Sequence, residues 1–368
     1  MARRGAEVAA ETDRLDGAPH PRDAAAIHGQ AKAVAALCAA LEGDRIPSGW
    51  LLAGPEGIGK ATLAYRMAGA LLARRPGGLG PGPLDLPPDH PDLRLIRSGA
   101  HPRLFVLRRG QDAHGRPRNV ITADEVRELR DFFGLSAADG GWRVVIVDVA
   151  DDLNAHAANA ILKILEEPPP RSVLVLVSHA PGRLLPTIRS RCRLLRLEPL
   201  APTAFRAALG AIGLETDRPE ALAELAGGSP GRAVRLIAGG GLDLYATIVS
   251  LFAARRPDRA AMVQLAETAG ASRGSEGRAT LLLDLLGTFM ARLAQAPLRP
   301  PAVEIVPGET AVLRQLAPHA AAARLWAEGH AAAMAAGRAG LAVNLDPAAL
   351  ILDTLLAIDR TARQAAAA

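Results

Sequence analysis

A glycine-rich stretch with one lysine, GPEGIGKAT at residues 54–62, is the part of the sequence best suited to bind phosphate. Gly54, Gly57 and Gly59 leave backbone N–H groups accessible, and Lys60 carries a charge that would neutralise phosphate oxygens. The stretch follows a short apolar run and precedes a helical pattern, which is the strand, loop and helix order that a phosphate-binding loop requires. The sequence therefore predicts such a loop.

The position after Lys60 departs from the GxxxxGK[ST] pattern. A hydroxyl at this position ligates Mg²⁺, and Ala61 has none. Thr62 follows, but one residue of helix turns a side chain by about 100°, so its hydroxyl does not simply replace the missing one. We keep Thr62 as a nucleotide-binding candidate, and we expect weak binding of ATP or ADP, with Mg²⁺ entering only with the nucleotide.

Asp148 follows four apolar residues, at the end of a strand where phosphate-loop ATPases hold Mg²⁺. Many of them place a Glu next to this Asp to polarise the attacking water, and here the next residue is Val149. Asp151 and Asp152 lie in the following turn and could point the wrong way. Loss of a general base costs roughly 10²–10⁴ in rate, so with Ala61 as well we do not expect intrinsic ATP hydrolysis.

Arg191 ends a helical segment after the second buried strand and has two interpretations. A cation in the last turn of a helix gains about 0.3–1 kcal/mol from the helix dipole, and Arg189 and Arg193 would serve that structural role equally well. An arginine at the rim of a sheet is also how one subunit reaches the γ-phosphate bound by its neighbour. The residues alone leave both interpretations open.

The elements that must position these residues are those of an α/β domain. Two short β-branched runs, 144–147 and 173–177, are typical of strands buried on both faces of a parallel sheet. Asn154 is a suitable N-cap for a helix between them, and three prolines, 168–170, end that helix. We expect further helices at 27–41 and after Thr122, and further strands at 50–53, 104–109 and 194–197.

The remaining chain divides by pattern. Residues 1–22 are polar and predict a disordered tail, 23–198 the α/β domain, and 199–242 three short helices in a compact lid. From 243 to 368 the pattern predicts only long amphipathic helices, and it leaves open whether their apolar faces pack within this chain or against a neighbour. The resemblance described below implies that this region is a helical collar and oligomerisation domain. Residues 75–92 are a proline- and glycine-rich insertion with no helical or strand period.

Composition places the chain among globular proteins of a reducing cytoplasm. Of 368 residues 49% are hydrophobic and 22% charged, and the net charge of +5 allows but does not demand contact with a polyanion. Cys38 and Cys192 cannot build a disulfide framework or a four-thiolate metal site, and we predict no metal site. Charges in the N-terminal region argue against a signal peptide, and no apolar run is long enough to span a bilayer. His101 and His114 are expected to be solvated loop histidines.

The segments AANAILKILEEPPP (157–170) and RLLPTIRSRC (183–192), with a strand between them, resemble the clamp-loader branch of the AAA+ ATPases. Its Ser-Arg-Cys signature would be Ser190, Arg191 and Cys192. The resemblance is strong over residues 27–240. It implies an α/β RecA-like P-loop (AAA+) domain with a parallel sheet, a three-helix lid and an all-α C-terminal collar domain.

The resemblance also implies roles for individual residues. Members that are defective as ATPases offer the Ser-Arg-Cys arginine to the neighbouring ATP site, so Arg191 would act in trans. Ser178 falls where a sensor residue is expected, and Arg232 falls near the second sensor. The segment with Ile27, Gly29 and Gln30 matches the family's adenine-side motif.

The implied setting is the clamp loader of bacterial DNA polymerase III, a hetero-oligomeric ring with delta and gamma or tau subunits that loads the sliding clamp at primed DNA. Many relatives carry a four-cysteine zinc module, and the corresponding insertion here has no cysteine, so zinc is not predicted. The chain would be an accessory subunit of the DNA-directed DNA polymerase.

Two other functions stay open at this point. An active gamma-like clamp-loader ATPase would hydrolyse ATP in isolation, and Ala61 and Val149 argue against it. A stand-alone DNA-binding module would need a basic stripe with interleaved aromatic residues, which is not visible in a chain with 3% aromatic residues.

Overall fold

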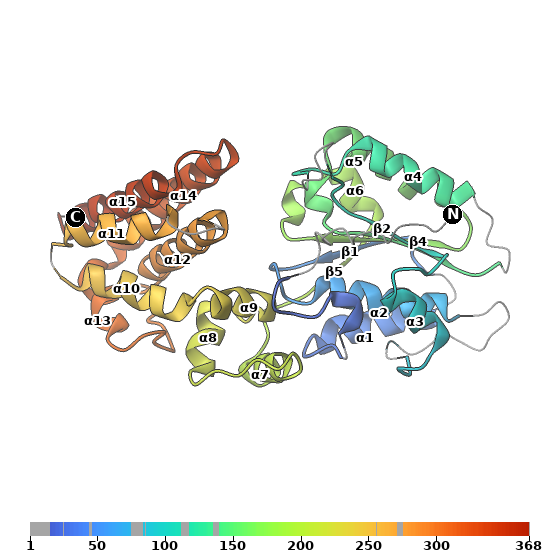
Figure 1. Cartoon of the computed structure of the whole chain (residues 1–368), viewed down its shortest axis with the longest axis horizontal. Coiled ribbons are helices and arrows are strands. Elements are labelled where there is room, and N and C mark those ends of the chain that lie inside the picture. The colour runs from blue at the N-terminus through green and yellow to red at the C-terminus, as the bar shows by residue number, and fades with distance from the viewer. Residues whose placement is uncertain are drawn as a thin grey trace, which may run out of the picture. The chain divides into compact units, whose positions relative to one another are not determined.

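A computed structural model describes residues 15–24, 26–43, 46–74, 84, 86–111, 118–134, 140–254, 256–270 and 275–367 (Figure 1). The chain forms two compact units. The first unit contains Met1–Glu215 and Gly228–Arg232, and the second contains Thr216–Gly227 and Ala233–Ala368. The predicted tail falls largely outside the described residues, as does much of the insertion at 75–92.

The first unit is built on a five-stranded sheet in the order β2-β3-β4-β1-β5, with every pair parallel. The strands are β1 (Gly49–Ala53), β2 (Leu104–Leu107), β3 (Arg143–Val147), β4 (Ser172–Ser178) and β5 (Arg193–Arg196). The residues of β1 and β4 are all buried, as expected of strands covered on both faces. The predicted α/β domain with a parallel sheet is confirmed.

Helices cover both faces of this sheet (Figure 1). One layer contains α4 (Ala123–Gly134), α5 (Ala155–Glu166) and α6 (Pro186–Arg191), and the other contains α1 (Ala31–Glu42), α2 (Lys60–Leu72) and α3 (Pro91–Arg97). Three short 3₁₀ helices, η1 (Pro21–Asp23), η2 (Ala150–Asp152) and η3 (Pro181–Arg183), lie in connections. The predicted N-cap is confirmed, because the side chain of Asn154 accepts the N–H of Ala157 at 2.8 Å.

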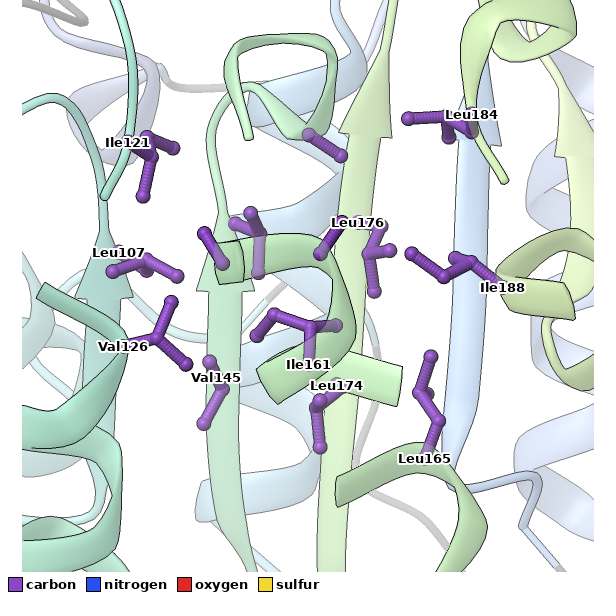
Figure 2. Close-up of a cluster of buried hydrophobic side chains, with 14 of the residues drawn as sticks. Leu107, Ile121, Val126, Val145, Ile161, Leu165, Leu174, Leu176, Leu184 and Ile188 are labelled. Carbon is purple, nitrogen blue, oxygen red and sulfur yellow. The ribbon is translucent and has the colours of Figure 1, made fainter. Parts of the chain in front are cut away.

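The core beneath α4, α5 and α6 is a cluster of aliphatic side chains from the strands and the helices (Figure 2). Ile161 of α5 lies over Val145 and Leu174 of the sheet, and Ile188 of α6 lies beside Leu176. Ile161 and Ile188 are fully buried, which fixes both helices on this face. The burial of two such side chains stabilises the packing by roughly 3–6 kcal/mol.

Two expectations about the first unit were wrong in detail. The first helix begins at Ala31 and not at residue 27, because Gly29 and Gln30 have φ angles of +65° and +59°, which a right-handed helix does not contain. His101 is buried and not solvated: its Nε2 lies 3.2 Å from Asp92, and its Nδ1 accepts the N–H of Arg103. His114 lies outside the described residues.

Three short helices follow the sheet, as predicted: α7 (Pro202–Gly210), α8 (Pro219–Leu225) and α9 (Pro230–Ala238). The division between the two units passes through this segment, so α7 belongs to the first unit and α8 to the second. The start of α9, up to Arg232, belongs to the first unit. The proposed domain boundaries at 198 and 242 remain predictions.

Every secondary-structure element among the described residues of the second unit is a helix, which confirms the predicted all-α region. Its long helices are α10 (Gly241–Ala253), α11 (Arg259–Gly270), α12 (Ser275–Gln295), α14 (Ala320–Ala342) and α15 (Pro347–Ala367), with the shorter α13 (Glu309–Leu316) between α12 and α14. Small residues allow close packing here: a Cβ at Gly287 of α12 would lie 2.6 Å from the sulfur of Met334 on α14. Among the described helices, no single one is long and apolar enough to cross a membrane. Helices α9 and α10 meet these criteria of length and composition only together, as a bent pair.

Candidate functional site

The predicted phosphate-binding loop connects β1 to α2 at the carboxyl edge of the sheet. Gly57 and Gly59 have φ angles of +72° and +101°, which residues with a side chain rarely adopt. Gly54 begins the loop, and its N–H lies 3.3 Å from the carbonyl of Ser178 at the end of β4. The helix starts at Lys60, so its first N–H groups open onto the loop as a phosphate site needs.

Lys60 is turned into its own loop. Its side chain is 2% exposed, and its Nζ donates to the carbonyls of Gly54 (2.7 Å) and Pro55 (2.6 Å). Burial lowers the pKa of Lys60 to about 8, an effect that the nearby carboxylates of Asp148 and Glu56 oppose. The ammonium is therefore committed to loop carbonyls in this structure.

A second segment of the first unit closes over the loop. Ser229 donates its hydroxyl to the carbonyl of Glu56 (2.7 Å), and the N–H of Gly231 donates to the carbonyl of Gly57 (2.9 Å). The two backbones approach so closely that a Cβ at Gly231 would lie 2.6 Å from the Cα of Gly57. No local sequence pattern indicates this contact, because the two segments lie far apart in the chain.

The same segment carries Arg232, the residue expected near the second sensor. Its N–H lies 3.3 Å from the hydroxyl of Ser229, and it is the third residue of α9. Thr62 lies half-buried in the first turn of α2. The structure thus brings both residues to the region of the loop.

Asp148 lies at the end of β3, where its N–H donates to the carbonyl of Leu107 (2.9 Å). It is close enough to Lys60 to affect the pKa of that amine. The following position, Val149, offers no carboxylate for a general base. The predicted acidic residue is thus in place without its usual neighbour.

Asp151 is used elsewhere. Its carboxylate accepts the hydroxyl of Ser178 (2.8 Å) and the N–H groups of His179 (2.6 Å) and Ala180 (3.2 Å). Ser178 is fully buried. Asp151 therefore holds the turn after β4, a role that its position three residues after Asp148 did not disclose.

Asp152 also has a partner. Its carboxylate lies 3.4 Å from the Nε of Arg109, and burial raises its pKa despite this cation.

Gln30, of the segment matched to an adenine-side motif, forms hydrogen bonds with backbone groups. Its amide nitrogen donates to the carbonyl of Glu198 (2.7 Å), and its amide oxygen accepts the N–H of the same residue (3.1 Å). Gly29 beside it has no room for a side chain, because a Cβ would lie 2.7 Å from Leu200. These contacts tie the start of α1 to the chain after β5.

Arg191 lies at the opposite edge of the sheet from the phosphate-binding loop. It is the last residue of α6, and its carbonyl would be 2.9 Å from a Cβ on Gly49, the first residue of β1. The loop begins after the other end of that strand, so about 16 Å of extended chain separates the two positions. Arg191 is 38% exposed and pairs with Glu166 (2.9 Å). It is therefore directed away from the phosphate-binding loop of its own chain.

Cys192, beside Arg191 in the Ser-Arg-Cys signature, is a packing residue. Its sulfur would lie 3.2 Å from a Cβ on Gly49, and it packs against the core cluster. Burial raises its pKa to about 12, so the thiol is protonated at neutral pH. Cys38 is likewise a free cysteine.

Comparison with known proteins matches the same region of the chain. Residues 29–201 match the family model described as "DNA polymerase III, delta subunit". The DNA polymerase III subunit delta' of Pseudomonas aeruginosa is 40% identical over 203 residues, which are 54% of this chain and 58% of that protein. The subunit delta' of Escherichia coli (strain K12) is 32% identical over 213 residues, 55% of this chain and 58% of that protein.

A subunit named gamma/tau is similar as well. That of Mycobacterium bovis is 32% identical over 197 residues, which are 52% of this chain and 31% of that protein. The chain thus matches less than two thirds of the length of each of these relatives. Over the matched region, the resemblance to the clamp-loader proteins that the motifs indicated is confirmed.

Proposed function

Because residues 29–201 match the DNA polymerase III delta subunit family and relatives named delta', we propose that this chain is a delta prime subunit of the DNA polymerase III clamp loader. In this role it assembles with delta and gamma or tau subunits in the cytoplasm. The assembly loads the sliding clamp at primed DNA. The chain itself would be defective as an ATPase and would supply Arg191 to an ATP site on a neighbouring subunit.

The position of Arg191 is the observation that carries the proposal. An arginine at the amino edge of the sheet cannot reach a nucleotide bound at the carboxyl edge of the same sheet. With its side chain partly exposed, it can meet a phosphate held by another chain. An arginine supplied in trans to a γ-phosphate stabilises the transition-state charge and contributes 10³–10⁵ in rate in other systems.

Three features of the phosphate-binding loop and of the neighbouring strand end support the ATPase-defective role. Ala61 provides no hydroxyl for Mg²⁺, Val149 provides no base, and Lys60 is bonded to the loop itself. We propose that ATP or ADP binds weakly if at all, with Mg²⁺ only as part of the nucleotide, and without zinc. The gamma-like ATPase alternative predicts hydrolysis by the isolated chain.

Reconstitution tests the proposal. The chain would be assembled with gamma or tau and delta, and ATP turnover measured with clamp and primed DNA. Arg191→Ala should lower stimulated turnover at least about 10³-fold at the one site that receives it, while assembly is unchanged. Arg189→Ala, which removes an equal charge at an exposed position of the same helix, is the control. Equal turnover with Arg191→Ala and wild type would contradict the proposed role of Arg191 at the neighbouring ATP site.

A further inference from the structure

Arg191 is held by two contacts at the ends of neighbouring helices. Its Nη2 lies 2.9 Å from Oε1 of Glu166, the last residue of α5, and its Nη1 donates to the carbonyl of Thr187 in its own helix (3.1 Å). Glu166 is 42% exposed, and the contact lies within the first unit. The guanidinium has five N–H donors, and these contacts use only part of that capacity.

The position of Glu166 is unfavourable for a carboxylate taken alone. The C-terminus of a helix carries a partial negative charge, and an acidic side chain there costs about 0.3–1 kcal/mol. Glu167 follows directly and adds a second negative charge. An exposed ion pair returns only about 0–1 kcal/mol, so the pair with Arg191 contributes little to the stability of the fold. What the contact does achieve is a defined direction for the guanidinium.

We propose that Glu166 is a positioning residue for Arg191. Its carboxylate orients the guanidinium of Arg191 before that group meets a nucleotide bound by a neighbouring subunit. This inference rests on the proposed function of Arg191. Immobilising a free arginine side chain at an interface costs about 0.5–1.5 kcal/mol of conformational free energy. Glu166 and Thr187 impose that order within the subunit, so less is lost when the guanidinium meets the transition state.

The test uses the full chain in the reconstituted complex at saturating ATP, clamp and primed DNA. Glu166→Ala is expected to lower kcat roughly two- to twelvefold, the change that corresponds to about 0.5–1.5 kcal/mol. The KM for ATP stays as in wild type, because ATP is bound by the other subunit. Glu166→Gln retains an acceptor oxygen of the same size and is expected to keep more than half of the wild-type kcat.

Glu167→Ala is the matched control, since it removes an equal charge from the adjacent exposed position. Its kcat should equal that of wild type within experimental error. The double variant Glu166→Ala/Arg191→Ala should turn over no more slowly than Arg191→Ala alone, because the carboxylate acts through the arginine. A further, additive loss in the double variant would overturn the positioning role. So would a raised KM with unchanged kcat.

The experiment tests the role of Arg191 and the positioning role of Glu166 independently. If Arg191→Ala leaves turnover unchanged, the proposed function of the arginine fails. If Arg191→Ala lowers turnover while Glu166→Ala behaves as wild type, only the positioning role of Glu166 is overturned. Thermal unfolding of each variant shows whether the first unit is folded. If the alanine variant is unstable, Glu166→Met, which has a similar length and no carboxylate, replaces it with the same expected loss of kcat.

Discussion

The hydroxyl of Ser178 donates to the carboxylate of Asp151 at 2.8 Å and joins the end of β4 to the turn after β3. The same carboxylate accepts the N–H groups of His179 and Ala180, so one side chain holds the start of the connection that leads to α6. Hydrogen bonds to a charged acceptor contribute about 1.5–3 kcal/mol. Asp151 is thus a structural clamp between two neighbouring strand ends.

Replacement of Asp151 should release this connection. In Asp151→Ala the hydroxyl of Ser178 and two backbone N–H groups lose their acceptor, and we expect the first unit to be destabilised by about 2–4 kcal/mol. Hydrogen exchange should show lost protection at the amides of His179 and Ala180 with little change in α2. Asp151→Asn, which keeps one acceptor oxygen, should have an intermediate effect. Unchanged protection in the alanine variant would contradict the clamp.

The close approach of Gly57 and Gly231 makes a second prediction. Gly231→Ala would place a Cβ 2.6 Å from the Cα of Gly57, and one backbone must move. We expect a loss of about 1–3 kcal/mol in the free energy of unfolding, as for other overpacked sites.

Gly210→Ala is the matched control for this substitution. Gly210 lies at the end of α7 in the same unit, and a Cβ there meets nothing within 4 Å. The change should be neutral or slightly stabilising, because alanine loses less backbone entropy than glycine. Equal melting temperatures for the two alanine variants would show that the loop and the segment 229–231 are not in the close contact described above.

Lys60 should make the stability of the first unit depend on alkaline pH. Its pKa is about 8 in the folded chain and about 10.4 when unfolded, so between these values the unfolded chain binds more protons. Stability therefore rises with pH through this window, as the penalty for a buried ammonium is removed. Relative to Lys60→Met, the wild type should gain on the order of 2 kcal/mol between pH 7.5 and 9.5.

Urea unfolding followed by tryptophan fluorescence measures this difference. In a Trp326→Phe background the remaining tryptophans, Trp50 and Trp142, both lie in the first unit and report on it alone. A wild type that follows the pH dependence of Lys60→Met would show that the amine is not buried as described.

The sheet and its helices could be predicted from the sequence because their signals are local. The β-branched runs that became β3 and β4, the N-cap Asn154 and the three prolines after α5 each act within a few residues. The α/β character and the helical C-terminal region follow from such patterns. The start of α1 was misjudged because the left-handed backbone at Gly29 and Gln30 depends on contacts with residues near 198–200.

The contacts that define the site were not predictable in this way. Ser229 meets Glu56 and Asp151 meets Ser178 across 173 and 27 residues of sequence, and no local pattern pairs them. The sequence marked Arg191 as a candidate, whereas Glu166 appeared only as part of a helix end. Its contact depends on how α5 and α6 pack on the sheet.

The absent hydroxyl after Lys60 gives a direct test of metal-assisted binding. Ala61→Thr restores the Mg²⁺ ligand of the phosphate-loop pattern, and we expect the affinity for ATP to rise about tenfold or more in the presence of Mg²⁺. Without Mg²⁺ the affinity should stay as in wild type. Thr62→Ala is the control and should leave the effect of Mg²⁺ unchanged, because its side chain is rotated by about 100° from this position. Equal titrations of Ala61→Thr and wild type would contradict the role assigned to Ala61.

Stability of the second unit should depend on Glu309, which is fully buried in α13. Its carboxylate accepts the hydroxyl of Tyr245 (2.7 Å), the Nε of Arg292 (2.7 Å) and the N–H of Ile305 (2.7 Å). Burial raises the pKa of Tyr245, so the phenol remains a donor at neutral and alkaline pH. Glu309→Gln leaves Arg292 without its main buried counter-charge and should cost about 3–5 kcal/mol.

Glu304→Gln separates this effect from simple loss of a charge near α13. Glu304 also accepts two backbone N–H groups, from Gly308 and Thr310, but it is exposed to solvent, so its replacement should cost no more than about 1 kcal/mol. Hydrogen exchange in α10, α12 and α13 would locate the change, with protection lost in Glu309→Gln and retained in Glu304→Gln. If both variants lose the same free energy of unfolding, the prediction is contradicted. A solvated carboxylate would then stabilise the unit as much as one buried with Arg292 and Tyr245.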